Sequence, residues 1–211
     1  MMQLTEKQIR EMMPHAGSRL DAHLPYIVPA LEKAAIDTPL RIAAFMAQLA
    51  HESGEYRYME ELADGSAYEG REDLGNVMPG DGVKYKGHGP IQITGRANHM
   101  VCGQALKLDL VNYPRLICNP QHGTASACWF WNSRRLSKVA DREWFRVTTR
   151  IINGGYNGWN DRLNYYQRNR EILGLEPYLG LLQEDVDVRK FQRDHGLTAD
   201  GVVGPMTLAK L

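Results

Sequence analysis

The sequence predicts a mainly α-helical protein with one long loop and a small helical unit at the C-terminal end. Three observations support this prediction. Residues that begin and end helices recur along most of the chain. Residues 64–90 are dense in Gly, Asp and Pro, which is typical of a loop. The segment "EPYLG" at 176–180 then interrupts the helical pattern.

The N-terminal region contains two well-marked helix starts. Thr5 can cap a first helix, because Gln8 follows at the capping-box position three residues later. The stretch "DTPLRIAAFMAQLAHESG" predicts a second helix, with Thr38 as its N-cap and Pro39 at its first position. Gly54 is expected to end this helix.

The middle of the chain combines an irregular segment with further helices. A loop as long as residues 64–90 in a compact domain is usually functional. After it, "IQITGRANHMVCGQALKL" predicts a short β-like segment and then a helix. The chain as far as about residue 175 is again mostly helical, with a Gly/Asn turn at "GGYNGW".

The C-terminal residues predict a separate small unit. We expect a helix with Val186, Val188 and Phe191 facing inward, a "TADG" turn, and a short helix that Pro205 begins. We therefore divide the chain into a domain at 1–176 and a module at 177–211. So small a unit buries little core by itself, so we expect it to pack on the first domain.

The composition is that of an ordinary globular protein. The 211 residues are 43% apolar and 24% charged, with 25 basic and 25 acidic side chains. This balance does not favour nucleic acid or an anionic membrane surface as a partner. No apolar stretch reaches the roughly 18 residues of a membrane span. Residues 1–13 lack the features of a signal peptide, so we expect synthesis in the cytoplasm without membrane insertion.

The three cysteines, Cys102, Cys118 and Cys128, are widely spaced and form no C-x-x-C pair. This pattern is neither a disulfide framework nor a zinc site. We interpret them as small buried hydrophobic residues, with one bond formed after release from the cell as the alternative. The sequence gives no indication of a metal or another cofactor.

Two acidic residues near the second helix are candidates for catalysis. Glu52 lies in its last turn, where the helix dipole and apolar neighbours favour the neutral form that a general acid needs. Glu61 follows nine residues later, beyond Gly54. Two carboxyls in unlike environments can divide the acid and base roles of glycoside hydrolysis. The alternative is a solvated helix tail followed by an acidic loop.

Other catalytic chemistries fit the sequence less well. "HESGE" lacks the second histidine of a zinc-protease motif, and "GHGPIQITG" matches neither a Walker A loop nor a dinucleotide fingerprint. The spacing identifies no serine or cysteine nucleophile. We interpret His51 as a structural histidine that bonds a backbone carbonyl beside Glu52.

Three separated motifs resemble glycoside hydrolase family 19. They are "AHES" with Glu61 nine positions after Glu52, "YKGHGPIQITGRAN" at 85–98 and "TRIINGGYNG" at 149–158. The resemblance extends over roughly residues 4–175 and is greatest to compact bacterial and phage members. It implies the lysozyme-like, mainly helical fold of this family of chitinases and phage endolysins.

The resemblance also implies roles for individual residues. Glu52 matches the general acid, Glu61 the general base, and Thr94 a hydroxyl that helps to hold the attacking water. Further matching residues are sugar-contacting Tyr85, Gln92 and Asn98, Asn153 in the second conserved loop, and Arg162 supporting the acidic site. From the residues alone, Gln92 and Thr94 could alternate along a short strand, Asn153 could be a turn residue, and Arg162 could form a surface ion pair.

Two features depart from the pattern of the relatives. Where they commonly have "YRGRG", this chain has "YKGHG", so Lys86 and His88 replace two arginines. A role for a fixed guanidinium there is in doubt, and a histidine could make the contact sensitive to pH. In addition, Glu60 directly precedes Glu61 and is the alternative general base.

The C-terminal stretch "VRKFQRDHGLTADGVVGPMTLAKL" resembles the second half of a peptidoglycan-binding module. The alternative is a simple helical cap. Together the resemblances imply a monomeric endolysin that cuts β-1,4 bonds in peptidoglycan after a holin-type pore releases it from the host cytoplasm to the cell wall. The alternatives are a chitinase acting on GlcNAc polymers and a non-catalytic wall-binding protein.

Overall fold

The structure is a computed structural model that describes residues 4–211. Between these residues the chain is mainly α-helical, as predicted, and β pairing is confined to isolated bridges. Residues 1–3 lie outside the described residues. They belong to the segment 1–13, for which the sequence predicts no signal peptide. The α-helices are α1 (Glu6–Met12), α2 (Leu24–Lys33), α3 (Pro39–Ser53), α4 (Asp81–Lys84), α5 (Arg96–Leu106), α6 (Pro120–Ser133), α7 (Leu136–Ala140), α8 (Phe145–Asn153), α9 (Trp159–Ile172), α10 (Leu181–Asp194) and α11 (Pro205–Lys210).

Helix α3 forms the centre of the main body and has the predicted ends. The Thr38 side chain accepts from Arg41 N, and Gly54 ends the helix in the left-handed region with φ of 54°. The side chains from residue 42 to residue 50 are buried. Helix α9 packs along α3, and Asn169 Nδ2 donates to Ala43 O over 3.1 Å. Two helices distant in sequence therefore form a common scaffold.

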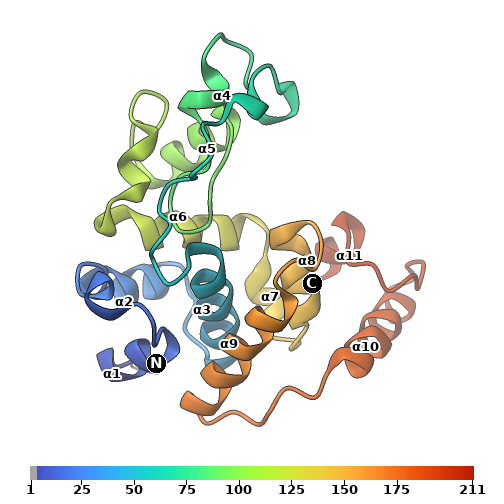
Figure 1. Cartoon of the computed structure of the whole chain (residues 1–211). Helices are drawn as coiled ribbons and strands as arrows, with labels where there is room; N and C mark the ends of the chain where they lie inside the picture. The colour runs from blue at the N-terminus through green and yellow to red at the C-terminus, as the bar shows by residue number, and fades with distance from the viewer. Residues whose placement is uncertain (1–3) are drawn as a thin grey trace.

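Figure 1 shows two parts of the molecule that meet at the end of α3. Helices α4 and α5 belong to an upper lobe, which the chain enters directly after α3. Helices α1, α2, α3 and α9 form the body below it, and α7, α8, α10 and α11 lie to one side. The candidate acids Glu52 and Glu61 are on the chain segment where the body passes into the upper lobe.

Residues 64–90 are more ordered than a simple loop prediction indicates. They contain 3-10 helices at Ser66–Tyr68 and Glu72–Leu74, followed by α4. The Asp81 carboxylate accepts from Val77 N and Met78 N and pairs with Arg96 at 2.5 Å. The hydrogen bond from Arg96 holds the pKa of Asp81 below its usual value. Carboxylates thus satisfy backbone groups that would otherwise bond water.

The predicted β-like segment is a tight turn instead of a strand. His88 and Ile93 exchange two backbone hydrogen bonds of 3.0 and 2.8 Å. Between them, Gln92 adopts φ of 53°, which the alternation of a strand does not allow. Gln92 and Thr94 therefore do not alternate along a short strand. The prediction of a following helix is confirmed by α5.

The C-terminal unit packs on the main body, as expected, but through a different face of α10. Val188 and Phe191 are buried, whereas Val186 is 56% exposed, so its predicted inward position is wrong. Glu184 faces inward instead of Val186, because positions 184, 188 and 191 share one face of the helix. The ring of Phe191 meets that of Trp144 edge to face at 5.7 Å.

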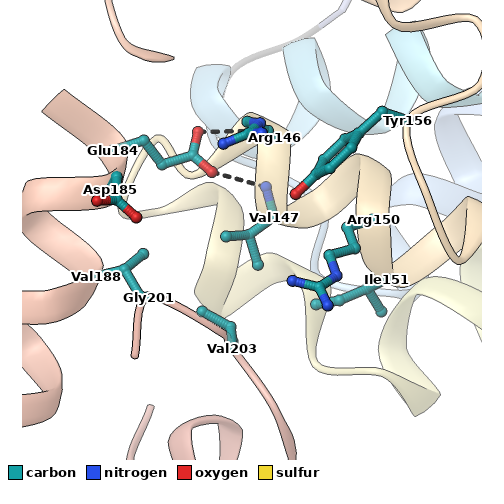
Figure 2. Close-up of a pocket in the computed structure, with 10 residues that line it drawn as sticks. All are labelled: Arg146, Val147, Arg150, Ile151, Tyr156, Glu184, Asp185, Val188, Gly201 and Val203. Carbon is teal, nitrogen blue, oxygen red and sulfur yellow. Dashed lines mark hydrogen bonds between the residues drawn. The ribbon is translucent and has the colours of Figure 1, made fainter. Parts of the chain in front are cut away.

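Figure 2 shows how Glu184 joins α10 to the start of α8. Its carboxylate accepts from Arg146 N at 3.0 Å and Val147 N at 2.7 Å, which are free donors of the first helical turn. The Tyr178 hydroxyl also donates to it. Burial raises the pKa of Glu184 against the opposing effect of these hydrogen bonds. The free backbone donors at the start of α8 therefore explain why an acidic side chain is buried at this position.

The remaining expectations concern the cysteines, a membrane span and the domain boundary. The thiols of Cys102, Cys118 and Cys128 are all free, and the first and last are buried. Cys118 Sγ donates to Met59 O over 2.8 Å. None of the helices in the described part of the chain combines the length and the apolar character that a membrane span requires. The domain boundary at 176/177 stays a prediction, although residues 173–180 separate α9 from α10.

Candidate active site

Glu52 lies in the last turn of α3 and is held by a buried arginine from α9. Arg162 Nη2 donates to Glu52 Oε1 over 2.6 Å. The Arg162 side chain is 1% exposed, whereas that of Glu52 is 18% exposed. The carboxylate thus faces solvent while its cation lies in the interior. Arg162 therefore lies beside Glu52, and the pair is not a surface ion pair.

Three helices fix the guanidinium of Arg162. Its Nη1 donates to Gln48 Oε1, and Gln48 Nε2 in turn donates to Thr149 Oγ1 of α8 over 2.8 Å. Its Nε donates to Asn157 O over 3.1 Å. A planar guanidinium with partners on several sides has little freedom to turn. Glu52 is therefore held in one orientation by α3, α8 and α9 together.

His51 has a different partner from the one that we expected. Its Nδ1 lies 2.6 Å from Asp161 Oδ2 of α9, and the imidazole bonds no backbone carbonyl among residues 4–211. Gly158 lies against the imidazole so closely that a Cβ there would be 2.1 Å from His51 Cε1. Only glycine fits this approach. The carboxylate at the start of α9 faces the end of α3, so His51 joins the two helices beside Glu52.

Asn153 ends α8 and shapes the loop that leads to α9. Its Oδ1 accepts from Asn157 N over 3.2 Å and so holds the loop after the helix. The same loop presents Asn157 O to Arg162. Contact of Asn153 with sugar stays a prediction.

Glu61 lies on an extended segment instead of a helix. Its backbone N donates to Gly87 O over 2.8 Å, and Gly87 N donates to Glu61 Oε2 over 2.8 Å. The Tyr68 hydroxyl donates to Glu61 Oε1 over 3.0 Å. Burial and this hydrogen bond raise the pKa of Tyr68, which stays a donor. Neutral donors from the loop thus hold the Glu61 carboxylate.

Glu60, the alternative base, has a contrasting environment. Its carboxylate pairs with Lys86 at 3.1 Å and with Arg115 at 2.9 Å. Burial acts to raise the pKa of Glu60, but the Lys86 hydrogen bond and the Arg115 charge outweigh it and hold that pKa below its usual value. A carboxylate bound by two cations is a poor proton acceptor. The geometry therefore favours Glu61 as the base.

The residues after the turn form a chain of hydrogen bonds next to Glu61. Gln92 Nε2 donates to Tyr58 O and Gly89 O, Thr94 Oγ1 donates to Gln92 O, and Asn98 Nδ2 donates to Thr94 O. All three side chains are half-buried. Within residues 4–211 the amide oxygens of Gln92 and Asn98 receive no hydrogen bond, so their acceptor capacity is unused.

Tyr85, which was expected at the substrate, is buried, and so is His88, whose role the sequence left open. The Tyr85 side chain is 0% exposed, and its hydroxyl donates to Val111 O over 2.7 Å. It supports the upper lobe, so direct sugar contact does not fit this structure. His88 is also buried, and its Nδ1 lies 3.1 Å from His99 Nε2. Burial and the neighbouring His99 lower the pKa of His88 to about 4.

Lys86, at a position where relatives commonly have an arginine, bonds the backbone on both sides of Leu62 and the carboxylate of Glu60. Its Nζ donates to Glu61 O over 3.0 Å and to Ala63 O over 3.4 Å, and it pairs with Glu60. An ammonium group can bond three acceptors that lie in different directions. Lys86 therefore stabilises the backbone that carries Glu61.

Sequence reasoning missed several of these supporting residues. Gln48 could have been found, since it is a polar residue one turn before Glu52 in an otherwise apolar helix. Thr149 and Asn157 lie within the motif at 149–158. Tyr68 gave no signal, because its hydrogen bond to Glu61 depends on the folded loop. In the described residues no group of His, Cys, Asp and Glu is arranged to hold a metal ion.

The family model described as chitinase class I, glycoside hydrolase family 19, matches residues 33–144, and the chain belongs to this family. The match includes Glu52 and Glu61 and ends before Asn153 and Arg162. A model of a peptidoglycan binding domain matches residues 187–211, which form most of α10 and all of α11.

Several plant proteins are similar in sequence. An endochitinase of Arabidopsis thaliana is 40% identical over 143 residues, which cover 64% of this chain and 49% of the relative. A basic endochitinase of Brassica napus is 34% identical, over 66% of this chain and 54% of the relative. An inactive chitinase-like protein of Hevea brasiliensis is 33% identical, over 66% and 57%. The chain thus spans about half the length of these relatives.

Solved structures of bacterial enzymes are similar in fold. Chitinase C from Streptomyces griseus has a TM-score of 0.70 at 25% identity, over 82% of this chain and 78% of that chain. A bacterial family 19 chitinase has a TM-score of 0.71 at 25% identity, over 82% and 96%. The similarity extends well beyond residues 33–144, so the family fold includes helices that the sequence model does not match.

Proposed function

We propose that this protein is an endolysin-type glycosidase that hydrolyses β-1,4 bonds between amino sugars of bacterial peptidoglycan. The observation that carries this proposal is the contrast between Glu52 and Glu61. One carboxyl ends a helix against a buried arginine, and the other lies on a loop with neutral donors. Such unlike environments let two carboxyls take different roles in one reaction.

In the proposed mechanism no carboxylate attacks the sugar. Glu52 protonates the oxygen of the leaving sugar, and Glu61 removes a proton from a water on the opposite face of the ring. Thr94 orients this water through the free lone pairs of its hydroxyl. Such an inverting mechanism needs the two carboxyls about 6.5–9.5 Å apart, to leave room for the water.

The C-terminal unit supports peptidoglycan as the substrate. Residues 187–211 are similar to a peptidoglycan binding domain, and Glu184, just before them on α10, bonds the start of α8, the helix that leads to the Asn153 loop. Like the phage endolysins that the sequence resembles, the protein is proposed to act as a monomer on the cell wall after a holin-type pore opens the host membrane.

A chitinase is the second candidate, because the similar plant proteins and the similar bacterial structures are named chitinases. A non-catalytic wall-binding protein is less well supported. The Hevea relative is named inactive, so family likeness alone does not establish catalysis. In this chain, however, Glu52, Glu61 and Arg162 are all present and are held by hydrogen bonds.

Mass spectrometry of digests tests these alternatives. Purified peptidoglycan and a chitin oligosaccharide are each treated with the wild-type chain and with Glu52→Gln, and new reducing ends are reduced with borohydride before analysis. We expect reduced N-acetylmuramic acid ends from peptidoglycan with the wild type only. Cleavage of chitin without cleavage of peptidoglycan would establish the chitinase, and binding to the wall without cleavage of either would establish the non-catalytic protein.

A further inference from the structure

A groove lies beside the segment that carries the candidate base. It has a volume of about 760 Å³, within the range of small-molecule binding sites. It lies between Glu60 and Lys86 on one side and the 3-10 helix Pro114–Cys118 on the other. We call it the Arg115 groove, and the residues used below are Glu60, Val83, Lys84, Lys86, Tyr113 and Arg115.

The Arg115 groove carries a local excess of positive charge. Lys84, Lys86 and Arg115 line it together with a single acid, Glu60, although acidic and basic residues balance over the whole chain. His88 adds no charge at neutral pH, because burial and His99 lower its pKa to about 4. Asp109 lies near Lys84, but its carboxylate accepts from Asn112 at the neighbouring turn.

Two of these three cations are available to a ligand. Lys86 Nζ is occupied by Glu60 and by two backbone carbonyls. Arg115 contacts Glu60 through Nη2, and its side chain is 75% exposed. Lys84 is exposed and forms no ion pair within residues 4–211. Apolar surface lies next to these charges, since Tyr113 is 65% and Val83 is 54% exposed.

The groove lies on the opposite side of the chain from the Glu61 carboxylate. Neighbouring side chains of an extended segment point in opposite directions. Accordingly, Glu60 contacts Lys86 and Arg115, whereas Glu61 contacts Tyr68 and Gly87. Four extended residues span about 13–14 Å, enough for a short peptide on a sugar near Glu61 to pass around this segment.

We propose that the Arg115 groove binds the carboxylates of the peptide stem that substitutes the peptidoglycan strand, with Arg115 and Lys84 as the charged contacts. Chitin has neither a peptide nor a carboxylate, so the groove selects substituted strands over chitin. Tyr113 and Val83 pack against the aliphatic part of the peptide. This inference rests on the proposed function, because it assumes that peptidoglycan is the substrate.

Binding measurements with full-length, catalytically silent protein test the inference. In the Glu52→Gln background, Lys84→Gln with Arg115→Gln removes the two available cations. The matched control, Lys33→Gln with Lys138→Gln, removes two exposed cations elsewhere on the surface. Calorimetry compares three ligands: soluble peptidoglycan strands with their stems, the same strands after an amidase has removed the stems, and a chitin hexasaccharide.

We expect the groove variant to bind intact strands about tenfold more weakly, with a change of less than about twofold for the other two ligands. The control should bind all three as the parent does, and added salt should reduce the difference. Equal weakening for all ligands, or none for intact strands, would overturn the inference. Equal weakening for stripped strands would show that the groove does not recognise the stem, because the lactyl carboxylate that the amidase frees is part of an amide bond in intact strands, and would also overturn the inference.

These outcomes differ from failure of the proposed function. If the wild type digests chitin but releases nothing from peptidoglycan, the proposed function fails at that step. If it digests peptidoglycan while the groove variant binds intact strands as tightly as the Glu52→Gln parent does, only the Arg115 groove inference fails. No affinity of the Glu52→Gln parent for intact strands would overturn the inference as well.

Discussion

The surroundings of Glu52 and Glu61 differ in how they are built. Helices hold Glu52, since α3 carries it, α9 supplies Arg162, and α8 supports Arg162 through Gln48 and Thr149. Loop residues hold Glu61, through the Tyr68 hydroxyl and Gly87 N. Helical packing fixes a side chain more rigidly than loop contacts do. The comparison teaches that one half of the site is fixed while the other can adjust.

This difference suits a reaction with two unequal carboxyls. A general acid must meet the leaving oxygen in one defined position. A general base must instead accept a water together with a bound strand, so a segment with some freedom is an advantage. We therefore expect substitution of the buried support of Glu52 to affect folding and catalysis together, and substitutions on the Glu61 side to affect mainly catalysis.

The largest expected effect is on catalysis by the acid. Glu52→Gln should lower the rate of peptidoglycan lysis at least about 100-fold, because general acid catalysis contributes ~10²-fold or more. The melting temperature should stay near that of the wild type, since a glutamine can still accept from Arg162. Turbidity of a wall suspension measures the rate. Retention of more than about 1% of the activity would refute the acid assignment.

The assignment of Glu61 as the general base is tested by comparison with the adjacent residue Glu60. Glu61→Gln should remove most of the activity, whereas Glu60→Gln should remove little, because Glu60 is bound by Lys86 and Arg115. The same lysis assay measures both variants at equal concentration of folded protein. The reverse result would make Glu60 the base.

The next effect is on the stability of the fold. It tests whether buried helical contacts hold Glu52 more firmly than loop contacts hold Glu61. Arg162→Gln should lower the free energy of unfolding by about 3 kcal/mol, because it leaves Glu52, Gln48 and Asn157 O without their buried partner. Activity should fall as well. Urea unfolding measures the change. A stability equal to the wild type would show that the helix-held half is not fixed as described.

The upper lobe should respond to acid through its buried histidines. Burial lowers the pKa of both His88 and His99 from 6.5 to about 4. The unfolded chain therefore binds protons below about pH 6.5, but the folded chain binds them only near pH 4. Stability is complete above pH 6.5 and decreases as the pH falls toward 4, by up to about 3 kcal/mol for each histidine.

Urea unfolding at pH 7 and pH 5 measures this loss. His23 adds a loss of the same sign, because burial lowers its pKa to about 4 as well. His99→Gln should therefore reduce the difference between the two pH values without removing it. His15→Gln, at an exposed position, is the control. An unchanged difference in His99→Gln would contradict the account of the histidine pair.

The smallest expected effect is at a single loop contact. Tyr68→Phe removes one hydrogen bond to Glu61, which is worth about 0.5–1.5 kcal/mol. We expect a fall in kcat of a few-fold and little change in melting temperature. A loss as large as that of Glu61→Gln would mean that the Tyr68 hydroxyl takes part in the reaction itself.

The sequence predicted those features that local chemistry determines. The capping box of Thr5 and Gln8 and the ends of α3 at Thr38 and Gly54 are as expected, because each depends on neighbours within a few residues. Glu184 was not predicted to be buried, since its partners are backbone groups of α8, about 40 positions away. The apolar pattern alone therefore placed Val186 inside.

The site was predictable to a similar extent. Motif matching selected Glu52, Glu61 and Arg162 as candidates, and the structure pairs Arg162 with Glu52, but the motifs could not show that Tyr85 is buried or that His51 bonds Asp161. The turn at 88–93 also escaped prediction, because a positive φ at Gln92 has no local signal such as glycine. Contacts between distant segments decided each of these cases.

The anomeric form of the first product tests the central claim, that Glu52 and Glu61 act as separate acid and base, most directly. NMR of a fresh digest of a β-linked oligosaccharide, recorded before mutarotation, shows which anomer forms first. The account predicts the α-anomer, because water attacks the face opposite the leaving sugar. An initial β-anomer would contradict the account, since it would require a covalent intermediate on one of the two carboxylates.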